Sequence, residues 1–181
     1  MKFPFRLAAA LAIVAAVASP VGSFAATAPH LLLQLKDGTV DIQLEPDLAP
    51  KTVQQIETLT NQGFYNGLTF HRVIDGFMAQ TGDPKGDGTG GSKLPNVPAE
   101  FTNTPFVRGT VGMARASDPN SGNSQFFIMF ADGSQLNGQY TVFGKVVSGM
   151  NFADEIKRGD PNNNGMVTDP DHIISAKIVN E

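Results

Sequence analysis

The chain has 181 residues, a net charge of −4 and no cysteine, and these properties exclude several kinds of chemistry. Without cysteine the protein has no disulfide, no thiolate metal ligand and no thiol nucleophile. Positive and negative side chains are interspersed, and no run of Lys or Arg supports a nucleic-acid or anionic-membrane partner. Nineteen Gly and 12 Pro indicate a turn-rich domain built mainly from strands.

The first residues have the pattern of a secretory signal peptide. Lys2 and Arg6 precede the uncharged apolar run 7–19, and Ser23 and Ala25 supply small residues at the spacing of a cleavage site. The apolar run is shorter than the roughly 20 residues that span a bilayer, which disfavours an uncleaved anchor. We therefore expect residues 1–25 to be removed on export and residues 26–181 to form one domain.

The predicted domain opens with a hairpin and a helix. Apolar runs at 30–35 and 39–44 flank a short turn that ends in Gly, as in a β-hairpin. Pro50 then opens a helical pattern at 51–62, in which apolar residues recur every three or four positions. Gly63 follows where a helix C-terminus commonly places a glycine.

Two short strands are predicted next, at Phe70–Ile74 and Phe77–Gln80, joined by the turn-forming pair Asp75-Gly76. If side chains alternate along them, five residues share one face: Phe70, Arg72, Ile74, Met78 and Gln80. A guanidinium on an apolar face needs a partner if that face is buried. An Arg at the open end of a sheet can instead extend to water, and this segment alone does not separate the two interpretations.

The rest of the chain predicts more strands than helices. Residues 82–105 are interrupted by glycines and prolines and are predicted to form a loop. Strands are predicted at 109–114, 124–130, 140–147 and 172–179, and a short helix at 150–157. We therefore predict a mainly β fold, a closed eight-stranded antiparallel barrel capped by two helices.

Two motifs suggest ligands that the surrounding residues disfavour. Residues 86–91 match the dinucleotide pattern G-x-G-x-x-G, but Pro95 and Pro98 prevent the helix that would bind phosphate, so a tight loop is the better interpretation. Residues 160–171 approach an EF-hand calcium loop, yet Asp171 replaces the bidentate Glu at its end. A solvated Asx-rich turn is the favoured interpretation, and a calcium-stabilised domain is a weaker alternative. The three histidines share no ligand spacing, so no metal site is expected.

Several segments together resemble one family. The sequence FHRVI-x-GFM-x-Q-x-GD occupies residues 70–83. Further blocks follow in the family's order at 49–53, 88–91, 112–114, 124–128 and 142–146. They resemble the cyclophilins, the cyclosporin-sensitive class of peptidyl-prolyl cis-trans isomerases, over residues 30–180. With its signal peptide, the chain is similar to the exported bacterial type.

The resemblance implies a capped barrel with the site on its outer face. Two residues are implied to be catalytic, Arg72 and Gln80. The implied substrate-binding residues are Phe77, Met78, Ala114, Arg115, Gln125, Phe127, Leu136 and Tyr140, of which Tyr140 stands where the family usually has His. Asp75 and Thr81 replace residues more usual in the family signature, and Gln135 stands where many members have Trp. We therefore expect weak cyclosporin binding.

The implied activity suits these residue types. Rotation about an X–Pro bond makes and breaks no bond, so no cofactor is expected. The twisted proline nitrogen gains a lone pair that the always-protonated Arg72 can stabilise. Phe77, Met78 and Phe127 can form an apolar socket for the ring, although without the resemblance ordinary core would be the better interpretation. The Ala114-Arg115 backbone can pair with the residues before the proline.

We therefore predict an isomerase that accelerates X–Pro isomerisation in exported proteins, with proline-containing unfolded or extended polypeptides as partners. The alternative is a non-catalytic chaperone or scaffold that binds such chains on the same fold. The Arg72/Gln80 pair favours the enzyme, because simple binding does not require a buried donor. We expect a monomer without nucleic-acid or membrane partners after signal cleavage. Export follows from the signal peptide, whereas a periplasmic location follows only from the resemblance.

Overall fold

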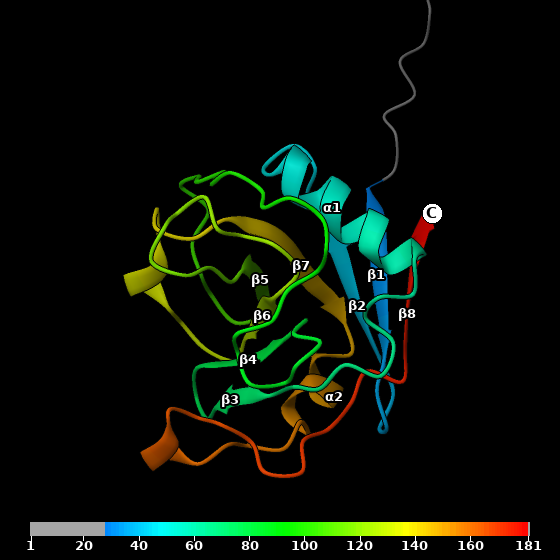
Figure 1. Ribbon diagram of the computed structural model, residues 1–181, viewed down its shortest axis with the longest axis vertical. Coiled ribbons are helices and arrows are strands. Elements are labelled where there is room, and N and C mark those ends of the chain that lie inside the picture. Colours follow the sequence, from blue (N-terminus) through cyan, green and yellow to red (C-terminus); the bar gives the residue numbers. More distant parts are fainter. Residues whose placement is uncertain (1–27, 181) are drawn as a thin grey trace, which may run out of the picture.

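The computed structural model describes residues 28–180, in which eight strands form one antiparallel sheet in the order β3-β4-β6-β5-β7-β2-β1-β8 (Figure 1). The strands are β1 (Pro29–Gln34), β2 (Thr39–Leu44), β3 (Arg72–Ile74), β4 (Met78–Thr81), β5 (Thr110–Met113), β6 (Phe126–Met129), β7 (Val142–Ser148) and β8 (Ser175–Asn180). The helices are α1 (Pro50–Asn61) and α2 (Met150–Asp154), with 3-10 turns η1 (Ser134–Leu136) and η2 (Pro161–Asn163). The predicted signal peptide, residues 1–25, lies outside the described residues.

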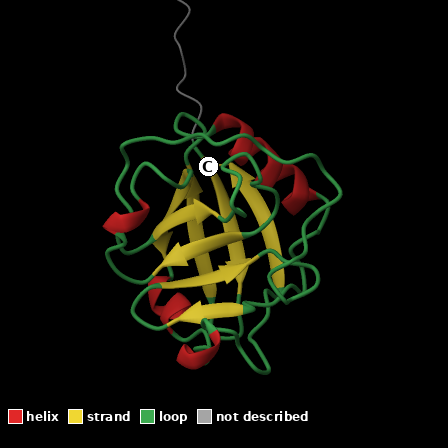
Figure 2. Cartoon of the chain, turned by 60° about the vertical axis from the view of Figure 1, so that its left-hand side comes forward, coloured by secondary structure: helices red, strands yellow, loops and turns green. Residues whose placement is uncertain are grey.

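The prediction of a closed barrel is wrong, because the edge strands β3 and β8 do not pair with each other. The sheet is an open, curled half-barrel, and Figure 2 shows one group of strands crossing the other. The chain that leads into β8 passes beside β3 and forms isolated bridges, Thr69 with His172 and Arg72 with Met166. It also makes backbone hydrogen bonds there, such as Val73 N–H to the Gly165 carbonyl at 2.7 Å, but no regular ladder. Asn164 and Asp169 have φ of 51° and 54° there, which prevents the extended backbone that a closing strand requires.

The first half of the chain folds as its pattern predicts. In β2 the apolar residues Val40, Ile42 and Leu44 are buried, and the residues between them are partly exposed. Helix α1 begins at Pro50 and buries one apolar face, and Gly63 beyond its end has φ 71°. Figure 1 shows α1 and α2 at opposite ends of the sheet. Within residues 28–180, every helix falls short of the length and apolar character required to cross a bilayer.

The sheet has apolar side chains on both faces. Along β6, Phe126 and Ile128 belong to the main core, while the alternate residues Phe127 and Met129 belong to a separate cluster. This second cluster comprises Met78, Phe106, Phe127, Met129 and Val142, with Leu48, Ile74, Phe77, Ala114, Leu136 and Tyr140 packed against it. The alternation of a strand thus separates Phe127 from the core residues beside it.

The β3–β4 hairpin turns through residues 75–77, so Phe77 lies in the turn and not in the second strand as predicted. Arg72 pairs with Gln80 and Ile74 with Met78, so these four side chains share a face. Phe70 does not share it, because regular pairing begins only at Arg72 and Phe70 is fully buried in the main core. Its predicted membership of that face was therefore wrong.

The glycine-rich segment 86–91 wraps around a carboxylate of the chain itself. Asp83 is 1% exposed and accepts the backbone N–H groups of Lys85, Asp87 and Gly88 at 2.8, 3.2 and 2.6 Å. A Cβ on Gly90 would lie 2.0 Å from an Asp83 carboxylate oxygen, so glycine is required for this close approach. No helix follows, in agreement with the predicted tight loop.

His71 lies beside this loop and gives a prediction for acid stability. It is 1% exposed, and neither ring nitrogen has a partner with hydrogen-bond geometry among the described residues. Burial lowers the pKa of His71, and the Asp83 carboxylate opposes this only in part. Below about pH 6.5, His71 therefore binds a proton more readily in the unfolded chain than in the folded protein. Its contribution to the free energy of unfolding is complete above that pH and is lost as the pH decreases.

We expect the free energy of unfolding, measured with urea, to decrease from pH 7 to pH 5.5, and His71→Gln to flatten that slope. The exposed His172 is the matched control, because His172→Gln should leave the slope unchanged. An NMR titration of the wild type tests the same point without a variant. A His71 ring that titrates like free histidine would contradict the prediction.

Candidate active site

A pocket of about 130 Å³ lies on the outer face of the sheet, over the second apolar cluster. Its nine lining residues are Arg72, Phe77, Met78, Gln80, Ala114, Arg115, Phe127, Leu136 and Tyr140. Every one of them is among the ten site residues predicted from the sequence. These residues lie on β3, β4, β6 and η1 or in the segments next to β4, β5 and β7, up to 68 positions apart. They come together because β3, β4, β6 and β5 are consecutive in the sheet.

Aromatic rings form the wall of this pocket. Phe127 is 5% exposed and stacks on Phe106 with ring centroids 5.7 Å apart. Tyr140 packs edge-on against Phe127 with centroids 5.9 Å apart. Rings held in these arrangements change shape little, so the pocket offers a preformed apolar surface. Sequence reasoning missed Phe106, which lies in the loop before β5 and has no periodic pattern around it.

Arg72 is held at the pocket by neutral acceptors. Its Nη1 donates to Gln80 Oε1 at 3.2 Å and lies 4.0 Å from Met78 Sδ. Its Nε donates to the Asn164 carbonyl and its Nη2 to Asn164 Oδ1, both at 3.0 Å. Burial lowers the pKa of Arg72, but a guanidinium stays protonated at any physiological pH.

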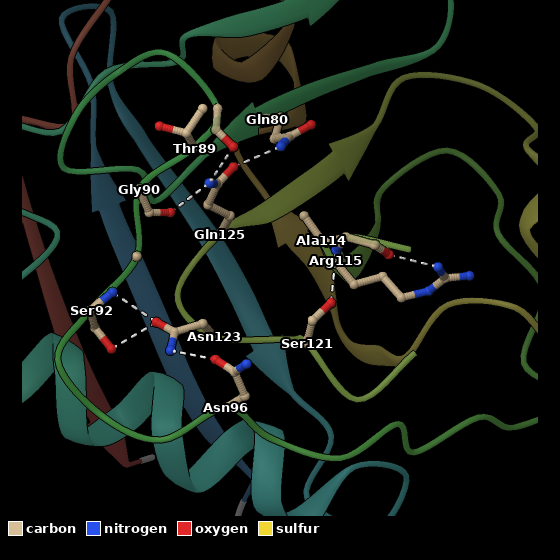
Figure 3. A pocket seen from close by; sticks show the side chains of 13 residues that line it. Gln80, Thr89, Gly90, Ser92, Asn96, Ala114, Arg115, Ser121, Asn123 and Gln125 are labelled. Atoms are coloured by element: carbon tan, nitrogen blue, oxygen red, sulfur yellow. Dashed lines mark hydrogen bonds between the residues drawn. The ribbon is translucent and has the colours of Figure 1, made fainter. Parts of the chain in front are cut away.

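A chain of amide hydrogen bonds fixes the orientation of Gln80. Because a guanidinium only donates, Gln80 must present its oxygen to Arg72 and its NH₂ group elsewhere. Gln80 Nε2 donates to Gln125 Oε1 at 2.8 Å, and Gln125 Nε2 donates to the carbonyls of Gly88 and Gly90 at 3.1 and 2.8 Å. Figure 3 shows Gln80, Gln125 and Gly90 in this relation. The glycine loop therefore supports the guanidinium through two side chains.

Gln125, the tenth predicted site residue, lies beside the aromatic pocket and not in its lining. It lies in an adjacent polar pocket of about 390 Å³ (Figure 3). Gln80 of β4, the loop between β4 and β5 and the segment between β5 and β6 form the lining of this polar pocket: Gln80, Gly88, Thr89, Gly90, Gly91, Ser92, Asn96, Ala114, Arg115, Ala116, Ser121, Asn123 and Gln125. Gln80, Ala114 and Arg115 line both pockets, so the two form one continuous groove.

Arg115 extends its side chain over Tyr140 at the edge of this groove. Its guanidinium carbon lies 4.5 Å from the ring centroid, within the range of a cation–π interaction. Nε and Nη2 donate to the Gln139 carbonyl at 3.3 and 3.1 Å, and Nη1 donates to the Ala116 carbonyl at 2.9 Å. Gln135 is exposed on η1 and lines neither pocket, so the expectation of weak cyclosporin binding stays a prediction.

Asn164 is the contact residue of Arg72 that sequence reasoning missed. It lies in the segment interpreted as a solvated turn, 92 positions away from Arg72. Two carboxylates of that segment serve donors of the chain: Asp160 accepts the Asn162 N–H and Asp171 accepts the Lys157 N–H, each at 2.8 Å. Among the residues with described positions, no group of three His, Asp or Glu side chains could hold a metal.

Comparison with known proteins agrees with this geometry. Residues 30–178 match the family model described as cyclophilin type peptidyl-prolyl cis-trans isomerase/CLD. A Brucella suis protein named "Probable peptidyl-prolyl cis-trans isomerase" is 56% identical over 98% of this chain and 97% of its own length. Peptidyl-prolyl cis-trans isomerase A of Dickeya dadantii is 40% identical over 96% of this chain and 97% of its own.

Solved structures show the same similarity. A cyclophilin-type isomerase of Cryptosporidium parvum, crystallised in the presence of the dipeptide Ala-Pro, has a TM-score of 0.76 and 30% identity, covering 84% of this chain and 99% of its own. Cyclophilin AquaCyp293 from Hirschia baltica has a TM-score of 0.72 and 28% identity, covering 81% of this chain and 72% of its own. The chain therefore belongs to the cyclophilin family of peptidyl-prolyl cis-trans isomerases, which are cofactor-independent enzymes.

Proposed function

We propose that this isomerase acts on X–Pro bonds of exported polypeptides, with Arg72 stabilising the twisted amide above an apolar proline pocket. The observation that carries the mechanism is a guanidinium held by neutral acceptors at the edge of an aromatic pocket. Support for the cellular context is the signal-peptide pattern of residues 1–25. We propose the periplasm as the location and a monomer as the active form, because one chain supplies the whole groove.

Catalysis requires the site to bind the twisted amide more tightly than the planar isomers. Twisting the amide breaks its resonance against a barrier of about 18–20 kcal/mol, and the nitrogen gains a lone pair at the top of that barrier. A donor aimed at the nitrogen binds the twisted state better than either planar isomer, and each 1.36 kcal/mol of that preference speeds rotation about tenfold. Because the donor is already in position, it needs no reorganisation when the charge develops.

Arg72 retains donors for this task. A guanidinium has five N–H groups. Two of them bond Asn164, one bonds Gln80 and one faces the Met78 sulfur at 4.0 Å, so at least one N–H remains for a substrate. In this proposal Gln80 is the second catalytic residue, because it orients Arg72 and faces the groove from β4.

The remaining groups bind the chain on either side of the bond. Phe77, Met78, Phe127, Leu136 and Tyr140 enclose the proline ring. The Ala114 N–H already donates to the Gln125 carbonyl at 2.9 Å, so pairing with the substrate backbone would use the Ala114 carbonyl and the Arg115 N–H. A non-catalytic binder on this fold would need the apolar pocket alone, and the supported Arg72–Gln80 pair favours the enzyme.

Removal of the guanidinium should abolish most catalysis. We expect Arg72→Ala to lower kcat/KM for a proline tetrapeptide by about 100-fold, the loss typical of one preorganised donor. Arg108→Ala is the matched control, because Arg108 pairs with Asp154 away from the groove. A wild type without a rate above background, or a fully active Arg72→Ala variant, would falsify the catalytic assignment.

Loss of the Asn164 side chain should lower kcat more than it raises KM, because Asn164 acts through Arg72. Asn164→Gly tolerates the φ of 51° and keeps the carbonyl that binds Nε, so it removes only the bond to Nη2. We expect kcat/KM to fall about tenfold, as for one hydrogen bond to a charged group. Asn164→Asp should recover little of the rate, because its carboxylate would compensate the guanidinium charge, and the exposed neighbour Asn163→Ala should have no effect. A loss confined to KM in Asn164→Gly, or a fully active Asn164→Asp variant, would contradict this positioning role.

A further inference from the structure

The groove carries positive charge in an acidic protein. The chain has a net charge of −4, yet the side chains that line the two pockets include Arg72 and Arg115 and no Asp or Glu. Both arginines line the aromatic pocket together with Tyr140. A concave site lined by one sign of charge attracts ligands of the opposite sign.

These two charges are not compensated within the described part of the chain. That part contains four arginines, and the two outside the groove form ion pairs: Arg108 with Asp154 at 2.6 Å and Arg158 with Asp75 at 3.0 Å. Arg72 and Arg115, by contrast, have no carboxylate partner within 4.0 Å among residues 28–180. Their acceptors are neutral carbonyl and amide oxygens.

Two acidic residues that lie close in sequence to pocket-lining residues serve their own loops. Asp87, on the glycine loop, accepts the N–H and hydroxyl of Thr89 at 2.8 and 2.7 Å. Asp118, on the loop between β5 and β6, accepts the Asn120 N–H at 2.9 Å. Neither residue lines a pocket.

The guanidinium of Arg115 is already fixed in position without a ligand. Its stacking on Tyr140 and its bonds to carbonyls fix the guanidinium at the edge of the proline pocket. Of its five N–H groups, four at most are used by the Gln139, Ala116 and Ser117 carbonyls. A fixed cation loses less entropy on pairing than a mobile one does.

We propose that this isomerase prefers proline-containing segments that carry Asp or Glu immediately beside the proline. The preference rests on the proposed function, because it assigns the substrate class of the same groove. A proline in the aromatic pocket places its neighbours at the edge that Arg115 occupies. The acidic side chain then pairs with Arg115, while Arg72 remains directed at the amide.

The test compares tetrapeptides Ala-Xaa-Pro-Phe and Ala-Ala-Pro-Xaa, in which Xaa is Glu, Gln or Lys. At low salt we expect the Glu peptide of at least one series to exceed its Gln analogue in kcat/KM by about three- to fivefold, the range of a partly exposed ion pair. The Lys peptide should be slower than Gln. The ratio should approach one in 1 M salt, because screening removes an exposed attraction.

Arg115→Gln should bring the Glu-to-Gln ratio close to one, whereas the matched control Arg108→Gln should preserve it. A wild type that isomerises Gln peptides but shows a ratio of one or less in both series overturns the preference and leaves the proposed function intact. If no peptide is isomerised, the proposed function fails, and calorimetric affinities for the same peptides still decide the preference. In the calorimetric test, equal affinities for the Glu and Gln peptides would overturn the preference. In the kinetic test, a Glu-to-Gln ratio that stays unchanged in Arg115→Gln would also overturn it.

Discussion

The site depends on a half-buried guanidinium that has no carboxylate partner. An Asp or Glu beside Arg72 would satisfy its charge more strongly, but it would also occupy the donors and reduce the attraction to a developing lone pair. Neutral acceptors from Gln80 and Asn164 fix the geometry of the guanidinium and leave its charge uncompensated. The fold must therefore bring β3, β4 and the loop before β8 together at one point.

A series of hydrogen bonds connects that guanidinium to the buried carboxylate of Asp83. Asp83 gathers the N–H groups of the glycine loop, the loop carbonyls orient Gln125, and Gln125 orients Gln80. The aromatic pocket is built on a cluster separate from the main core, so substrate binding need not disturb the packing that stabilises the fold. The polar and apolar parts of the groove are thus supported by different sets of residues.

Local patterns predicted the parts of the fold that local physics determines. The predicted turn at Asp75-Gly76 lies between β3 and β4, and the predicted common face of Arg72, Ile74, Met78 and Gln80 is observed. The pocket position of Phe127 was implied only by the family resemblance, because its own pattern favoured ordinary core. The open edge of the sheet was not predicted, because two short extended segments look alike whether or not they pair. Asn164 was missed for a related reason: its side chain acts across 92 positions, and its own neighbours indicate only a turn.

The most direct test of the central claim separates binding from rotation. Two-dimensional NMR exchange on a saturating proline peptide gives the cis–trans rate on the enzyme, and chemical-shift titration gives the affinities of both isomers. If Arg72 acts on the twisted state, Arg72→Ala should slow the bound exchange by about 100-fold and change both affinities by less than about fivefold. A variant that binds peptide far more weakly but exchanges it at the wild-type rate when saturated would contradict the account.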